Sequence, residues 1–217
     1  MIKNRFLFLL PLFLLGFNSC AGISADIQIR KDGSGKIVLE YRFSRMAEAI
    51  GKLDGNEKWH IIPAGRADME RTVARIDGMK LVSFSTKENK NDIINKVKLE
   101  FSNTQALVKF LDPSGKRAYF SREGSSNKLA IIFNESVPAE TDPQLLDLVR
   151  SVSEPYRCGV SFSAWKNSEM SVTNGAGGII SAPKEARVVT TGKKVSFSAG
   201  TADLLEKKDG LGLIFTW

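Results

Sequence analysis

Residues 23–44 contain two stretches in which apolar and polar residues alternate, on either side of the turn Asp32-Gly33-Ser34-Gly35. Ile27 and Ile29 are the apolar positions before the turn. After the turn, the apolar positions are Ile37, Leu39, Tyr41 and Phe43. Successive side chains of a strand point to opposite faces, and glycine permits the backbone angles of a short turn. The pattern therefore predicts an antiparallel hairpin with one buried and one polar face.

Short helices are predicted after these strands. Ser44 is a candidate N-cap for a helix over residues 46–53, and apolar residues recur at helical spacing within residues 66–77. Ser102 and Gln105 have the spacing of a capping box, which predicts a helix over residues 102–112. The chain is thus expected to place short helices between pairs of strands.

Two of these segments have similar sequences. Residues 36–54 and 96–112 both read as a strand, a Phe-Ser pair, a short helix and an aspartate. Duplication and convergence on a common pattern both explain the match. Between them, residues 80–85 are expected to form a strand with Val82 and Phe84 on one side.

Units of hairpin followed by helix can bury their helices on one face of a mostly antiparallel sheet. We therefore predict an α+β fold with the helices packed on one face. After residue 155 strands prevail, including a hairpin over residues 187–198 and a final strand over residues 211–217. One domain over residues 25–217 is expected, with a subdivision near residue 155 as an alternative.

The first nineteen residues have the features of an export signal. Lys3 and Arg5 precede an apolar run from Phe6 to Phe17, which is shorter than the roughly 20 residues that cross a bilayer as a helix. Ser19 and Cys20 follow this run. The segment is therefore expected to be a cleaved signal peptide.

The end of this leader resembles the lipobox of bacterial lipoproteins, with Phe17 and Asn18 departing from the usual residues as in the relaxed boxes of spirochaetes. The resemblance implies that residues 1–19 are removed, that Cys20 is acylated, and that residues 20–24 form the lipid-anchored N-terminus. Ordinary cleavage near Ala21 is the alternative. If Cys20 is kept unmodified, a disulfide to Cys158 is a further alternative.

Composition excludes some partners. The formal charge is +7 and falls to +5 when Lys3 and Arg5 leave, and the remaining charges of both signs are mixed along the chain. A nucleic-acid-binding protein is expected to gather its cations into a patch with stacking aromatic residues. We therefore expect no nucleic-acid partner, while attraction to anionic lipid headgroups remains open.

The residue types needed for catalysis or metal binding are scarce. His60 is the single histidine, Cys158 is expected on an apolar face where a thiol is inert, and there is no G-x-S-x-G elbow. The glycine-rich residues 174–178 lack the lysine and helix of a phosphate-binding loop. No catalytic, metal or cofactor site is predicted, although a pair of carboxylates able to hydrolyse glycosides leaves no sequence signature.

The opening ADIQIRKDGSGKIVLEYRF and the general layout resemble LppM-like bacterial lipoproteins. This resemblance implies an envelope domain that meets lipid or glycolipid. From the residues, we expect a groove of Phe, Leu and Ile under the helices that suits acyl chains or a protein partner. The predicted function is that of a non-enzymatic, lipid-anchored protein of the bacterial cell envelope, at the periplasmic face or outer membrane. A surface adhesin and an unrecognised hydrolase of envelope polymers are the alternatives.

Overall fold

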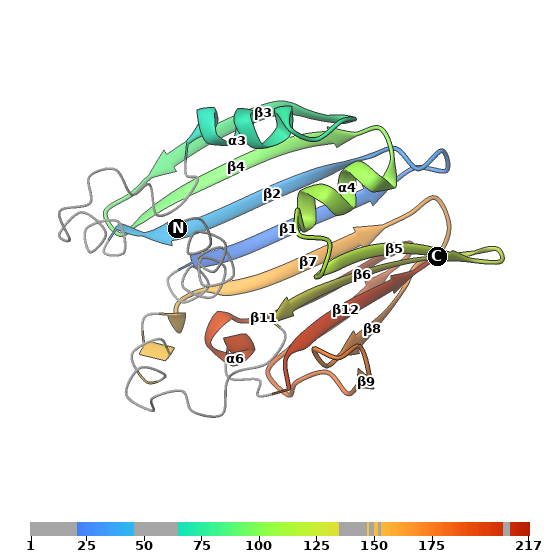
Figure 1. Ribbon diagram of the computed structural model, residues 1–217. Helices are drawn as coiled ribbons and strands as arrows, with labels where there is room; N and C mark the ends of the chain where they lie inside the picture. Colours follow the sequence, from blue (N-terminus) through green and yellow to red (C-terminus); the bar gives the residue numbers. More distant parts are fainter. Residues whose placement is uncertain (1–20, 46–64, 135–146, 148–149, 152, 206–208) are drawn as a thin grey trace, which may run out of the picture.

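Two β-sheets form the body of the computed structural model, which describes residues 21–45, 65–134, 147, 150–151, 153–205 and 209–217 (Figure 1). The larger sheet has seven strands in the order β10 (Arg187–Thr191), β11 (Lys194–Gly200), β7 (Arg157–Ser163), β1 (Ala21–Ile29), β2 (Gly35–Ser44), β4 (Asp92–Phe101) and β3 (Met79–Glu88). The smaller has five strands in the order β5 (Ala118–Glu123), β6 (Ser126–Asn134), β12 (Leu211–Thr216), β8 (Glu169–Thr173) and β9 (Ile179–Ile180). The helices whose bounds are described are α3 (Arg66–Ala74), α4 (Thr104–Leu111) and α6 (Thr201–Leu205).

The structure confirms the opening hairpin that the sequence pattern predicts. Strands β1 and β2 pair antiparallel with Ile27 opposite Ile37, and β4 continues the sheet beyond β2. Gly33 in the turn has a φ of 83°, the left-handed conformation that glycine adopts without strain. The sheets are mostly antiparallel, as predicted, and the described parallel pair is β1 with β7.

Strand β3 corrects one predicted face. The pairing of β3 with β4 shifts between Leu81 and Ser83, so Val82 is an extra residue in the strand. Such a bulge reverses which side chains face inward beyond it. Leu81 and Phe84 are therefore partly buried while Val82 is exposed, and the prediction that Val82 and Phe84 share a face is wrong.

The core lies between the two sheets. From the seven-stranded sheet, Ile27, Phe162 and Phe197 are fully or almost fully buried. Phe162 packs on Phe215 of β12 with ring centroids 4.9 Å apart, and Phe197 packs on Phe133 of β6 at 6.1 Å. The single sheet expected from sequence is thus two sheets, and a second sheet covers much of the face on which only helices were expected.

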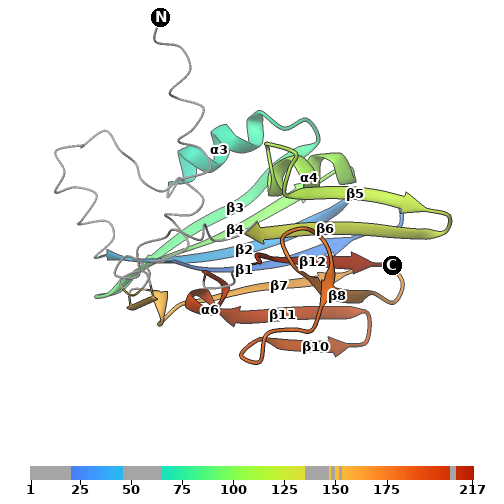
Figure 2. The ribbon, with the colours of Figure 1, turned by 60° about the horizontal axis from the view of Figure 1, so that its bottom comes forward.

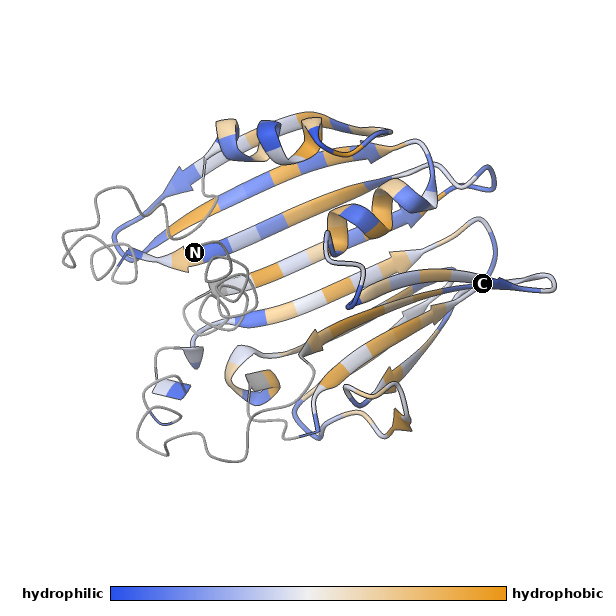
Figure 3. Ribbon diagram, viewed as in Figure 1, coloured by the Kyte–Doolittle hydropathy of each residue, from blue (hydrophilic) through white to orange (hydrophobic). Residues whose placement is uncertain are grey.

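Strand β12 explains why the second sheet forms. Its alternate residues Leu211, Leu213 and Phe215 are completely buried, and Ile214 on its other face is also buried. A strand that is apolar on both faces needs cover on both sides. Phe215 on its inner face packs on Phe162 of the larger sheet, and β12 itself is the central strand of the smaller sheet, between β6 and β8. Its mostly apolar colouring is visible in Figure 3.

Helices α3 and α4 begin where the sequence placed helices. Met69 and Val73 of α3 are buried, and this helix packs beside β3. The N-cap of α4 is Asn103, whose Oδ1 accepts a hydrogen bond from the Ala106 N–H at 2.9 Å, so the expected cap at Ser102 is wrong by one residue. The helix predicted over residues 46–53 lies outside the described residues.

The last third of the chain contributes to both sheets. Strand β7 pairs with β1 in the middle of the larger sheet, and β11 and β10 follow on its far side. Strands β8 and β12 belong to the smaller sheet. As a result, β1 lies between two strands that are far apart in sequence, and its first residues help to form the site described next.

Candidate functional site

The outer face of the seven-stranded sheet, which points away from the smaller sheet, is mostly polar, although Val38, Ile94 and Val189 also lie on it. Strand alternation and pairing register place on it every second residue of the seven strands. Its basic residues are Lys36, Arg42, Lys80, Lys87, Lys96, Lys98, Arg157, Arg187 and Lys194, and its acidic residues are Asp26, Glu40, Asp92 and Glu100. Cations therefore outnumber carboxylates on this face.

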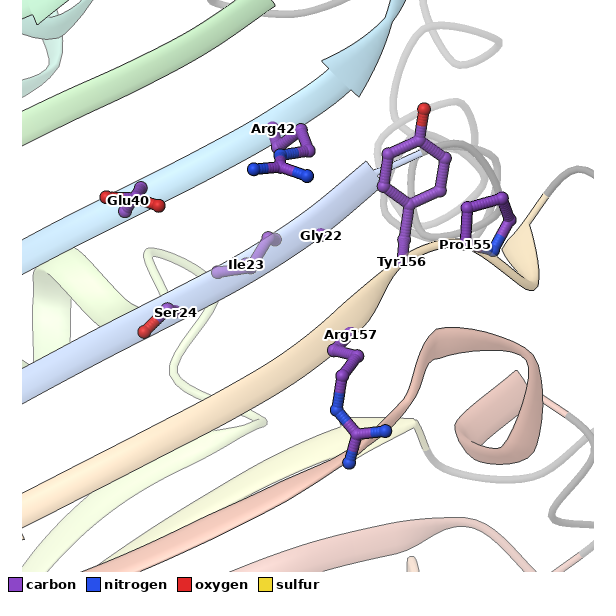
Figure 4. A pocket seen from close by; sticks show the side chains of 8 residues that line it. All are labelled: Gly22, Ile23, Ser24, Glu40, Arg42, Pro155, Tyr156 and Arg157. Carbon is purple, nitrogen blue, oxygen red and sulfur yellow. The ribbon is translucent and has the colours of Figure 1, made fainter. Parts of the chain in front are cut away.

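A hollow of about 240 Å³ lies on this face where β1 begins (Figure 4). Three elements supply its lining: the start of β1, the end of β2, and the segment leading into β7. The lining residues are Gly22, Ile23, Ser24, Glu40, Arg42, Pro155, Tyr156 and Arg157. We call it the N-terminal hollow, because the first residues of β1 line it.

Glycine at position 22 lets β7 approach β1. A Cβ atom on Gly22 would lie 3.0 Å from the Arg157 carbonyl oxygen and 3.4 Å from the Arg157 nitrogen, both of them backbone atoms that cannot easily move. Gly22 also pairs with Arg42 on β2. The arginine side chains from the neighbouring strands therefore stand on either side of a floor that has no side chain (Figure 4).

The polar groups at the N-terminal hollow are held by neighbours on adjoining strands. Arg42 Nη1 lies 4.0 Å from Asp92 Oδ2, and Asp92 Oδ1 accepts a hydrogen bond of 2.9 Å from the Tyr156 hydroxyl. Arg157 Nε donates to Ser198 Oγ at 3.3 Å. These contacts orient both guanidinium groups, and at 4.0 Å the Asp92 carboxylate neutralises Arg42 only weakly.

The guanidinium groups of Arg42 and Arg157 are each suited to bind an oxyanion, although the Arg157 side chain runs away from β1 toward Ser198 of β11 (Figure 4). Each presents planar N–H donors that match the oxygen atoms of a phosphate or carboxylate. Glu40 is the single carboxylate in the lining, and its Oε2 lies 3.6 Å from Lys96 Nζ, outside the hollow. The chemistry that this arrangement supports is recognition of an anionic group.

The centre of the outer face has hydroxyl groups and one ion pair. Lys194 reaches across β7 to Asp26, with Nζ 2.7 Å from Oδ2. The Ser161 and Ser196 hydroxyls lie 2.9 Å apart. The buried Oδ1 of Asp26 has no hydrogen-bond donor among the described residues. The short side chains here protrude less from the sheet than the lysine and arginine side chains that surround them.

A second hollow of about 350 Å³ lies at the opposite end of the same strands. Arg30, Lys31 and Lys36 supply its charge, and Trp165 supplies an aromatic ring. None of its lining residues is acidic. We call it the distal hollow, because it lies where β1 ends.

Cys158 lies where its sequence pattern placed it. It is 8% exposed on the inner face of β7, and its Sγ is 3.4 Å from Thr201 Oγ1. Burial raises the pKa of the Cys158 thiol, which outweighs the opposing effect of the Thr201 hydrogen bond. Cys158 is thus a core residue. Cys20 and His60 lie outside the described residues.

The hollows differ from the expected apolar groove. Each is lined by charged residues, and neither contains two facing carboxylates of the kind that hydrolyse glycosides. Within the described ranges, no group of three or more His, Cys, Asp or Glu residues could hold a metal ion. None of the described helices is long and apolar enough to cross a bilayer.

Sequence reasoning missed Arg42 and Arg157 as site residues. The alternation of β2 and β7 does assign both arginines to a polar face, but that signal is shared by every other polar residue of these strands. Only the parallel pairing of β1 with β7 sets the two arginines on either side of the first residues of β1. Parallel neighbours far apart in sequence leave no local pattern.

No protein-family model matches the sequence, and a search of curated proteins finds no relative. Among solved structures, the chain is similar to the folded domain of LppM from Mycobacterium tuberculosis, determined by NMR. The TM-score is 0.44 and the identity 9%, over 91% of this chain and 88% of that chain.

A weaker match is the mu homology domain of Fcho1 from Danio rerio with a bound Eps15 peptide. Its TM-score is 0.17 and its identity 12%, over 91% of this chain and 78% of that chain. Likeness at these levels shows neither membership of a family nor a ligand.

Proposed function

We propose that this chain is a non-enzymatic, lipid-anchored protein of the bacterial cell envelope, tethered through Cys20, whose outer face contacts anionic lipid headgroups at the N-terminal hollow. The observation that carries the proposal is the short path between the tether and the hollow. Strand β1 begins at Ala21, and Gly22 already lines the hollow. Two residues span at most about 7 Å, so an acylated Cys20 would keep the hollow close to the membrane surface.

Charge supports the same orientation. Arg42 and Arg157 flank the hollow, and each basic residue near an anionic membrane contributes about 1 kcal/mol to binding. The acyl chains would supply most of the affinity, because each buried CH₂ contributes about 0.8 kcal/mol. The two arginines would then set which side of the domain lies on the headgroups.

The tether is tested first with the Cys20→Ser variant. The native protein is expected in the detergent phase of a phase-separation assay, with acyl mass on its N-terminal peptide. The serine variant should move to the aqueous phase and keep its circular dichroism spectrum, because residue 20 precedes β1. If the variant stays with detergent, or if the native peptide carries no acyl mass, the lipoprotein hypothesis is wrong.

Headgroup contact is tested separately, in the Cys20→Ser background. The protein is mixed with phosphatidylglycerol vesicles and, in parallel, with phosphatidylcholine vesicles. Replacing Arg42 and Arg157 by Gln should weaken binding to the anionic vesicles by about 2 kcal/mol, or roughly thirtyfold. The matched control replaces Lys31 and Lys36 of the distal hollow by Gln, which removes the same charge. Equal losses in both variants would contradict a specific role for the N-terminal hollow and leave the tether untouched.

The surface adhesin differs from this proposal in the direction that the tether faces. Protease treatment of intact cells distinguishes the two, since only an outward-facing domain is cleaved. We expect protection in intact cells and cleavage after the outer membrane is opened.

A further inference from the structure

The seven-stranded sheet has two edges, β3 and β10, and they are protected to different degrees (Figure 2). An edge strand presents unpaired N–H and C=O groups to other chains unless bulges, charges or covering elements block it. Strand β3 has all three protections. It contains the bulge at Val82 and the lysines Lys80 and Lys87, and α3 packs beside it.

Strand β10 is less protected within the described part of the chain, where Arg187 at its start is its one charged residue. Its sequence RVVTT contains no lysine or proline, and its pairing with β11 runs without a shift from Arg187 to Thr191. All five residues are exposed, with Val188 at 44% and Val189 at 38%. Exposed β-branched residues on a regular edge favour addition of another strand.

The hairpin turn determines which backbone groups of β10 are free. Strands β10 and β11 are joined by the two residues Gly192-Lys193, so Thr191 and Lys194 form the pair that closes the turn and exchange both backbone hydrogen bonds. Along an antiparallel strand such residues alternate with residues whose groups point the other way. The N–H and C=O groups of Val188 and Thr190 therefore point away from β11, toward solvent.

We propose that β10 pairs antiparallel with β10 of a second copy of this chain, around a two-fold axis at Val189. This register sets Val188 opposite Thr190, so the free groups of each copy meet those of the other. It also sets Arg187 opposite Thr191. A two-fold interface must be self-complementary, and here no like charges lie directly opposite each other.

Charge also favours this antiparallel register. Arg187 is the one charged residue of β10, and the register keeps the two Arg187 side chains at opposite ends of the paired strands, whereas a parallel in-register pairing would set them side by side. A second copy also offers free backbone groups at the same spacing, at Val188 and Thr190. This match favours a second copy over an unrelated strand as the occupant of the edge.

The two-fold axis stands perpendicular to the sheet, so both copies present their outer faces to the same side. Strand β10 runs in the same direction as β1, because β11 is antiparallel to β10 and to β7, and β7 is parallel to β1. The two Ala21 ends therefore lie at opposite ends of the joined sheet. Resting on the proposed function, this geometry suits a dimer that lies along one membrane with both tethers reaching it.

Cysteine cross-linking tests the register without the tether, in the mature protein with Cys20→Ser. At the axis, the two Val189 residues form a non-hydrogen-bonded pair with Cα atoms about 4.5 Å apart, within the range that a disulfide spans. The Val189→Cys variant should therefore convert to a covalent dimer under mild oxidation. The matched control is Val188→Cys, whose two copies are displaced by two residues along the strands, about 7 Å, and should stay monomeric. Cys158 is buried in the parent structure and is not expected to cross-link in either variant.

A second variant tests the backbone bonds. Thr190→Pro removes an N–H that points to solvent in the monomer and that the dimer uses, so the hairpin should remain intact. Sedimentation of the parent protein should show a concentration-dependent dimer, which the Thr190→Pro variant loses while keeping the circular dichroism spectrum of the parent. Equal cross-linking of the two cysteine variants, or a folded parent that stays monomeric at every concentration, would overturn the proposal.

Discussion

The two faces of the seven-stranded sheet contain alternate residues of the same strands, but the inner face stabilises the fold and the outer face is available for binding. On β7, Phe162 points inward and is fully buried against β12, while Ser161 and Ser163 point outward beside polar neighbours. The inner face gains its stability from apolar area removed from water. The outer face contributes little to stability and is free to serve binding. Substitutions should therefore separate the two roles residue by residue.

The largest effect is expected on the inner face. Phe162 is 0% exposed and contacts both Phe215 and Trp217, with ring centroids 4.9 Å and 4.8 Å apart. Phe162→Ala should lower the free energy of unfolding by about 3–5 kcal/mol, measured by urea denaturation. The control on the same strand is Ser163→Ala, for which we expect a change within about 0.5 kcal/mol. Similar losses in the two variants would show that β7 is not divided into a packed and an open face.

The inner face is also the part of the fold that sequence specified best. Alternation located β1, β2, β4, β7, β11 and β12 and marked residues such as Ile27 and Cys158 as inward. It could not say that the strands form two sheets, because period two is the same whichever sheet a strand joins. The bulge at Val82 was missed because it depends on how β3 pairs with β4. The N-cap at Asn103 was missed because it depends on the residue at which α4 begins.

The outer face was harder to interpret. Its polar positions followed from the same alternation, but the N-terminal hollow depends on a parallel partner more than a hundred residues away in sequence. The tether at Cys20 came from a local motif and stays a prediction. The role proposed for Arg42 and Arg157 depends on the three-dimensional fold, since nothing in the sequence indicates that both lie beside the first residues of β1.

An intermediate effect is expected at Asp112, where the chain passes from α4 toward the smaller sheet. Its carboxylate is 5% exposed and accepts hydrogen bonds from the backbone N–H groups of Ser114, Arg117 and Ala118. Burial alone would raise the pKa of Asp112, but the accepted hydrogen bonds together lower it below its usual value. Asp112→Asn loses charge-assisted bonds, so we expect a loss of about 1–3 kcal/mol at pH 7.

The pH dependence of that loss follows from its sign. A carboxyl group whose pKa is lower in the folded state stabilises the fold above its unfolded pKa of about 3.9, and this contribution disappears as the pH falls through the folded value. The gap between wild type and Asp112→Asn should therefore narrow in urea titrations carried out below pH 4. Asp77→Asn, at an exposed carboxylate, is the control and should show no such gap. A gap that stays constant with pH would mean that Asp112 acts through its shape and not through its charge.

The smallest effect is expected on the outer face, at the Lys194–Asp26 ion pair. The two side chains are 43% and 30% exposed, so water and salt screen their attraction despite the 2.7 Å separation. A double-mutant cycle with Lys194→Gln and Asp26→Asn should give a coupling of about 0.2–1 kcal/mol that decreases between low and high salt. Asp26→Asn alone should change the free energy of unfolding very little. The substitution loses the attraction to the Lys194 charge. In return, because Asp26 Oδ1 has no donor among the described residues, the new amide can orient its NH₂ group toward the neighbouring hydroxyl groups. A coupling several times larger and insensitive to salt would mean that this part of the outer face is packed like the inner one, and the division of roles between the two faces would fail at the centre of the sheet.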